Sequence, residues 1–158
     1  MEAVASRPEV RRARDWLERF DDETLRWQRS IAAIPAPTGD ERRRAEVVSE
    51  RLGEMGLDSR RLDAAGNVIA RRGTSGGTGV VVAAHLDTVF PADTDLTVRQ
   101  LGPRYIAPGI SDNARGLAGI VALAGAIRHA GITTTLPVTF VHVYHPELKR
   151  SVYQAARS

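Results

Sequence analysis

Apolar residues in the first part of the chain recur with the spacing of an α-helix. Trp16, Phe20 and Ile31 belong to this pattern, which extends over the first forty residues. It is interrupted by "PAP" at 35–37, because proline lacks the N–H that a continuing helix needs. The pattern therefore predicts an N-terminal helical region.

A second helix is predicted directly after this break. The segment "TGDE" places Thr38 three residues before Glu41, which is the spacing of a capping box at a helix N-terminus. Val48 and Leu52 continue an apolar stripe, and Gly56 is a typical C-terminal stop. We expect a helix that begins near Thr38 and ends near Gly56.

The rest of the chain alternates between strand-like and helical patterns. Residues 59–73 are expected to form two short strands joined at "AAGN", which is a hairpin signal. Residues 80–87 form a continuous apolar strand of the kind that is buried on both faces of a sheet. Residues 99–110 are expected to be extended, 114–130 to be helical, and "LPVTFVHVY" at 136–144 to be a second buried strand. This order predicts an α/β fold, with a layered sheet and helices on both of its faces.

Composition narrows the classes of function. The 158 residues suffice for one domain, and the absence of cysteine excludes thiolate ligands, so any metal must be bound by histidine and carboxylate. The net charge is only +3 and arginines alternate with acidic residues, so we expect no nucleic-acid partner. The longest apolar stretch, 116–127, is too short to span a bilayer and the charged N-terminus is unlike a secretory signal. We therefore expect a cytoplasmic protein without a membrane partner.

The apolar strand 80–87 ends on His85 and Asp87, which are candidate site residues. Side chains two positions apart in a strand point to the same side, so the carboxylate can bond one ring nitrogen of the histidine. Such a bond fixes the tautomer and raises the basicity of the other nitrogen as a metal ligand. Two polar residues that merely end a strand would be an equally good interpretation of this motif alone.

A second polar stretch, "APGISDNARGLAGIVAL", places Asp112 and Asn113 in a glycine-bracketed loop that opens a helix. Asp112 alone would be interpreted as a helix N-cap. However, ligands in α/β sheets gather beyond the carboxyl ends of the strands, and the helix that follows can bring Asp112 near the end that carries His85.

Together, "AAHLDTVFP" and "GISDNARGLAGIVALAGAI" resemble the catalytic domain of the M20 zinc metallopeptidases, which include peptidase T, glutamate carboxypeptidases and acetylornithine deacetylase. The resemblance implies that His85 binds one zinc ion, that Asp87 orients it, and that Asp112 bridges two zinc ions. Asn113 stands where the family often has aspartate. The implied reaction is hydrolysis of a peptide or N-acyl amide bond by a zinc-activated water, with Zn²⁺ replaceable by Co²⁺.

The resemblance fails after the second buried strand. The family has a glutamate pair there, whereas in ungapped register Pro146 stands in the position of the general base and Glu147 in that of the zinc-binding glutamate. His145 is a candidate substitute ligand. We therefore expect residues 1–144 to be the N-terminal part of an incomplete M20-like catalytic domain, and 145–158 to be a tail unrelated to the family.

Three functions stay open on the sequence. The first is a zinc hydrolase for a small peptide or N-acyl amino acid, inactive as this chain alone. The second is a non-catalytic binding module with at most a weak metal site. The third is a zinc enzyme completed by a second polypeptide. Because the second strand would normally be followed by more of the sheet, an exposed sheet edge would favour self-association.

Overall fold

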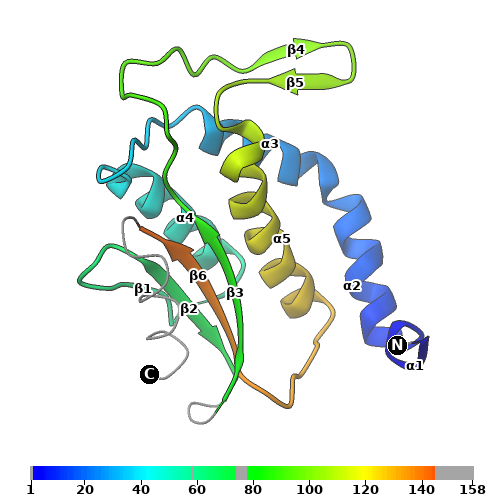
Figure 1. Cartoon of the computed structure of the whole chain (residues 1–158). Helices are drawn as coiled ribbons and strands as arrows, with labels where there is room; N and C mark the ends of the chain where they lie inside the picture. The colour runs from blue at the N-terminus through cyan, green and yellow to red at the C-terminus, as the bar shows by residue number, and fades with distance from the viewer. Residues whose placement is uncertain (1, 58, 74–77, 145–158) are drawn as a thin grey trace.

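The computed structural model describes residues 2–57, 59–73 and 78–144. Figure 1 shows a small sheet, a set of helices packed against it and a separate hairpin that projects from the body. The helices are α1 (Glu2–Ala5), α2 (Pro8–Arg19), α3 (Asp21–Ala32), α4 (Arg42–Glu54) and α5 (Arg115–His129), the last preceded by the kinked turn η1 (Ile110–Ala114). The strands are β1 (Arg61–Leu62), β2 (Val68–Arg72), β3 (Val80–His85), β4 (Arg99–Leu101), β5 (Arg104–Ile106) and β6 (Val138–Val143).

The main sheet has the order β1-β2-β6-β3, and β6 lies in its interior. β3 runs parallel to β6, and β2 runs antiparallel to it. All six residues of β6 are buried, as the sequence predicts, because it has a neighbour on each side. The same prediction is wrong for β3, which has one neighbour in the described sheet and leaves Val80 47% exposed.

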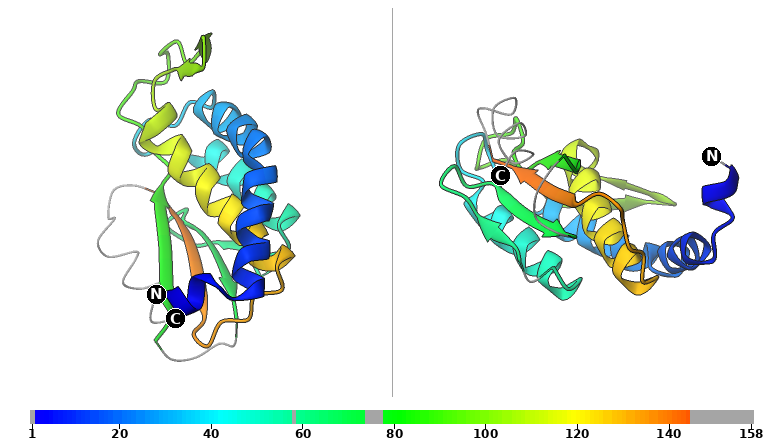
Figure 2. Two further views of the ribbon diagram at one scale, coloured as in Figure 1. Left: turned by 90° about the vertical axis from the view of Figure 1, so that its right-hand side faces the viewer. Right: turned by 90° about the horizontal axis from the view of Figure 1, so that it is seen from below.

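Three helices pack on one face of this sheet and form the main core with it. Residues of α3, α4 and α5 join those of β2, β3 and β6 in a single apolar cluster, and Figure 2 shows the helices gathered on one side of the strands. The predicted α/β class and layering are confirmed, and of the two faces on which helices were expected, the described helices cover one. Gly125 of α5 permits close packing, since a Cβ there would meet Met55 Sδ at 2.5 Å and Trp16 Cη2 at 2.7 Å.

The opposite face of the sheet is also apolar. Ile69, Val141 and Val143 form a second cluster with the half-buried Val81. These residues alternate along their strands with those of the main core, as the two-residue period of a strand requires. A sheet with apolar side chains on both faces is typical of an interior layer.

The hairpin predicted over 59–73 is confirmed as β1 and β2, with Leu62 opposite Val68. Its loop is organised by Asp63, whose carboxylate accepts bonds from the backbone N–H groups of Ala65 and Asn67 and from the Asn67 amide. The extended region predicted over 99–110 forms the hairpin of β4 and β5. No helix in the described part of the chain is long and apolar enough to cross a membrane.

The predicted capping box at the start of α4 is wrong. The helix begins at Arg42, and its N-cap residue, Glu41, makes no capping bond with its side chain. Glu41 Oε1 instead accepts a bond from the N–H of Gly39 at 2.9 Å. Thr38 is directed away from the helix, toward the end of β3.

Candidate metal site at the end of strand β3

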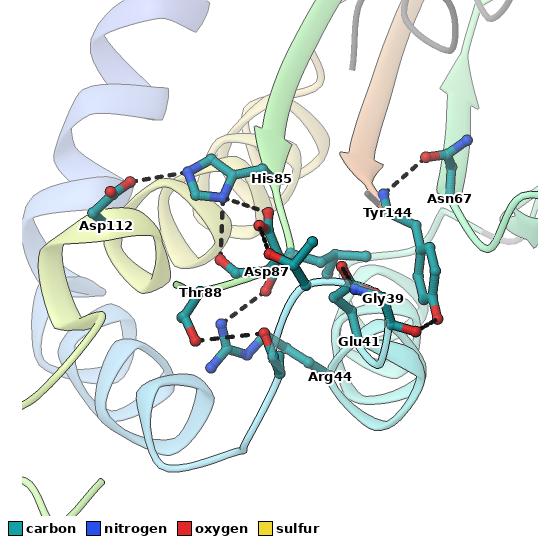
Figure 3. Close-up of polar contacts among 12 residues, drawn as sticks. Gly39, Glu41, Arg44, Asn67, His85, Asp87, Thr88, Asp112 and Tyr144 are labelled. Atoms are coloured by element: carbon teal, nitrogen blue, oxygen red, sulfur yellow. Dashed lines mark hydrogen bonds and ion pairs between the residues drawn. The ribbon is translucent and has the colours of Figure 1, made fainter. Parts of the chain in front are cut away.

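His85 is the last residue of β3, and Asp87 follows it by two positions. Their side chains meet as the alternation of a strand predicts, with His85 Nδ1 3.0 Å from Asp87 Oδ1 (Figure 3). His85 Nδ1 also lies 3.1 Å from the backbone oxygen of Asp87. Because both neighbours are acceptors, Nδ1 carries a proton and donates it. The carboxylate of Asp87 thereby holds the ring in one orientation, an arrangement that is common for histidine metal ligands.

Asp112 lies on the other side of this imidazole. Its Oδ1 is 2.9 Å from His85 Nε2, and its side chain is 87% exposed compared with 29% for His85. The turn η1 that carries it has non-helical backbone angles at Asp112 and Asn113, and the peptide bond between them is cis. Gly109 opens the turn with a φ of +70°, and a Cβ there would meet Thr88 Cγ2 at 2.8 Å. The sequence-predicted His85, Asp87 and Asp112 therefore lie in one row.

Two residues beneath this row were missed as site residues by the sequence analysis. Thr38 Oγ1 donates to Asp87 Oδ2 at 2.9 Å, so both carboxylate oxygens of Asp87 are engaged. Arg44, on α4, is 1% exposed and donates to the backbone oxygens of Leu86 at 2.8 Å and Ile34 at 2.5 Å. A signal for Arg44 exists in the sequence, because it is four residues before a residue of the apolar stripe of α4 and shares its face.

Burial dominates the electrostatics of Arg44. Loss of solvent lowers the pKa of its guanidinium to about 10, while the nearby carboxylates of Asp87 and Glu41 act in the opposite direction. At neutral pH the side chain is therefore a buried cation beside the anion that orients His85. Buried charges of this kind are retained when they are paired and hydrogen-bonded.

A cavity of about 260 Å³ opens beside His85 and Asp112. Its wall combines these polar side chains and others with apolar ones, and Val89, Phe90 and Ile110 are among the apolar lining residues. A cleft with a few convergent polar groups in an apolar wall is the usual form of a small-ligand site.

The donor chemistry of the row fits zinc, which takes imidazole nitrogen and carboxylate oxygen. Two such donors on one tetrahedral zinc ion lie about 3.3 to 3.5 Å apart, given bond lengths of about 2.0–2.2 Å. His85 Nε2 and Asp112 Oδ1 are 2.9 Å apart, so they would separate by about 0.4–0.6 Å to hold the same ion. Within residues 2–57, 59–73 and 78–144, no group of three or more histidine, cysteine and carboxylate side chains is arranged so that it could hold a metal ion. The candidate ligands Glu147 and His145, and Pro146 at the expected base position, lie outside the described residues.

The comparisons with solved structures agree with the fold. The chain is similar to the di-peptidase Dug1p of Saccharomyces cerevisiae (15% identity, TM-score 0.71, 91% of this chain and 37% of that one). It is also similar to human carnosine dipeptidase 1 (16%, TM-score 0.68, 89% and 35%) and to a tripeptidase of Staphylococcus aureus (19%, TM-score 0.64, 77% and 35%). The chain thus spans little more than a third of the length of these structures. A comparison with curated protein sequences finds no match.

The family comparison bears on the sequence-based resemblance. The sequence profile of peptidase family M28 matches residues 67–147, just over half of the chain, and this segment contains His85, Asp87 and Asp112. The expectation that the chain belongs to a peptidase family is confirmed, although the matching profile is that of family M28 and not of M20. The chain belongs to peptidase family M28.

Proposed function

We propose that this chain carries part of the metal site of a zinc-dependent peptidase or amidohydrolase, with His85 and Asp112 as metal ligands. The observation that carries the proposal is the convergence of His85 Nε2 and Asp112 Oδ1 at 2.9 Å, with Nδ1 of the same ring engaged by Asp87. A surface ion pair has no need of a third side chain that fixes the tautomer of the histidine, whereas a metal ligand does.

Each residue of the row has a separate role in this proposal. His85 would present Nε2 to the metal and Asp112 its carboxylate, for which the resemblance to the M20 peptidases implies a bridging role. Asp87 holds the Nδ1 proton and directs the ring. When bound, zinc or a substituting Co²⁺ supplies an acidified water and polarises the amide carbonyl. Glu147 is the proposed third ligand.

We infer a small substrate, either a short peptide or an N-acyl amino acid. Similar folds occur in proteins named as a di-peptidase, a tripeptidase and carnosine dipeptidase 1. The "HLDTVFP" and "GISDNARG" motifs resemble the M20 zinc peptidases, so we propose that the chain is close to the M20 type in its chemistry as well. The apolar residues Val89 and Phe90 beside His85 are suited to exclude water from a bound amide.

We further propose that the chain does not turn over substrate by itself. Two zinc ligands are assembled in its described part, whereas catalytic zinc takes three protein ligands. Pro146, in the position of the general base, has no proton acceptor in its side chain. Loss of a general base alone lowers a rate by roughly 10²–10⁴-fold.

The test is an assay of hydrolysis with excess Zn²⁺ or Co²⁺, using dipeptides and N-acyl amino acids. We expect no metal-dependent turnover from the wild type or from Pro146→Glu, because restoring a carboxylate does not complete the ligand set. Turnover by the wild type that is lost in Asp112→Ala would support the hydrolase chemistry and contradict the proposed inactivity. Turnover by Pro146→Glu alone would show that the base was the missing group.

A further inference from the structure

Arg44 stands out among the buried polar residues because its surroundings connect it to the candidate site and not to solvent. It belongs to a helix in which Arg42 and Arg51 make exposed pairs with glutamates one turn away. Arginine is almost never fully buried unless its charge is compensated. A fully buried guanidinium at this position therefore indicates that its hydrogen bonds hold a particular part of the structure in place.

The first contact of Arg44 is with Leu86, the one residue between His85 and Asp87. Arg44 Nη1 donates to Leu86 O at 2.8 Å, and Leu86 N donates to Val143 O of β6 at 2.9 Å. The one residue between His85 and Asp87 is thus held from the helix side by Arg44 and from the sheet side by β6. A change in the backbone angles of Leu86 would change the direction of the His85 and Asp87 side chains relative to each other.

The second contact extends the same restraint to the segment that carries Thr38. Arg44 Nη2 donates to Ile34 O at 2.5 Å, at the end of the α3 region. Residues 36–38 run beside the chain after β3, where Thr88 N donates to Ala36 O at 2.8 Å. One guanidinium therefore joins the two segments whose side chains meet at the carboxylate of Asp87.

We propose that Arg44 is a positioning residue for the metal ligand His85, acting through Leu86 and through the Thr38–Asp87 hydrogen bond. Arg44 does not contact the imidazole; it fixes the backbone on both sides of the Asp87 carboxylate. Figure 3 shows Arg44 below Asp87, with His85 and Asp112 above. The proposal rests on the proposed function only in treating His85 Nε2 as a metal ligand.

Four substitutions, two at Arg44 and two at Thr38, separate the parts of this arrangement. Arg44→Lys keeps a cation, but a single ammonium group lacks the planar fork that reaches both carbonyls. Arg44→Met removes the charge and the donors while retaining most of the apolar stem. Thr38→Val removes the hydroxyl with little change of shape, whereas Thr38→Ser retains the hydroxyl.

The primary readout is the tautomer of His85, measured from ¹⁵N ring shifts of the metal-free chain at pH 8 in an Asp112→Ala background, because the Asp112 carboxylate is a further acceptor 2.9 Å from His85 Nε2. We expect the Nδ1–H form to dominate in this background alone and with Thr38→Ser. In Arg44→Met and Thr38→Val we expect the Nε2–H form to rise several-fold, with Arg44→Lys between. The second readout is zinc affinity, which we expect to fall about 10- to 100-fold in Arg44→Met, as for other residues that orient metal ligands.

The matched control is Leu52→Ala, on the same helix and fully buried in the main core. It destabilises the fold through a cavity but touches no residue of the row. Equal tautomer shifts in Leu52→Ala and Arg44→Met would overturn the proposal, as would an unchanged tautomer ratio in Arg44→Met. If Arg44→Met does not fold, Arg44→Lys and Thr38→Val decide by the same criteria. If zinc does not bind even to the wild type, the proposed function fails, whereas the tautomer measurement still tests Arg44.

Discussion

His142 makes the stability of this chain sensitive to mild acid. The residue lies in the buried central strand β6, between Val68 of β2 and Ala84 of β3, and is 0% exposed. Neither ring nitrogen has a hydrogen-bond partner within the described part of the chain. Burial lowers the pKa of His142 from 6.5 to about 4, and the backbone of Leu117 offsets only part of this shift.

The sign of the effect follows from the two pKa values. Above pH 6.5 the imidazole is neutral in both states, and its contribution to stability does not change with pH. As the pH falls from 6.5 toward 4, the unfolded chain takes up a proton that the folded chain does not, so the free energy of unfolding decreases. With about 1.36 kcal/mol per pH unit, the loss between pH 7.5 and pH 5 is about 2 kcal/mol, a large share of a total of roughly 5–15 kcal/mol.

The test is urea unfolding of the wild type and His142→Leu at pH values from 7.5 to 5, followed by tryptophan fluorescence. As the pH falls from 7.5 to 5, we expect the free energy of unfolding of the variant to rise by about 2 kcal/mol relative to that of the wild type. The reason is that the unfolded variant has no imidazole at this position to take up a proton. His129→Leu, at an exposed position, is the control and is expected to leave the pH dependence as it is. Parallel stability curves for the wild type and His142→Leu would refute the reasoning.

Two further predictions concern packing and the sheet edge. Gly125→Ala is expected to destabilise the fold by about 1–3 kcal/mol through overpacking, whereas Gly119→Ala, with no atom within 4 Å of the new Cβ, is expected to stabilise it by about 0.5–1 kcal/mol. Urea unfolding distinguishes them, and changes of the same sign would contradict the packing described for α5. Val80, 47% exposed on β3, is expected to promote self-association, so Val80→Glu should shift the chain toward monomer in light scattering after size exclusion. A wild type that stays monomeric at all concentrations would oppose this prediction.

The parts of the site that the sequence predicts are those governed by local geometry. The contact between His85 and Asp87 follows from the two-residue alternation of a strand, and it is present at 3.0 Å. The roles assigned to these residues and to Asp112 stay predictions. The parts that sequence reasoning missed depend on distant partners. Thr38 has the spacing of a helix cap, but its hydroxyl bonds a carboxylate 49 residues away.

In the fold, too, features set by local sequence were predictable and features set by distant partners were not. β3 and β6 have similar apolar compositions, so a pattern alone predicts both as buried, although the number of neighbours differs between them. Arg44 belongs to a run of arginines that resembles a solvated helix face. Only the packing of α4 against the end of β3 reveals that its guanidinium is buried.

The most direct test of the metal site is a titration of the metal-free chain with Zn²⁺ by calorimetry, in the wild type, His85→Ala, Asp112→Ala and the control His129→Ala. We expect weak binding by the wild type, because few ligands are assembled, and an unchanged affinity in His129→Ala. Binding should be lost in both His85→Ala and Asp112→Ala, since each removes one of two converging donors. Tight binding of two equivalents that persists in His85→Ala would contradict the account.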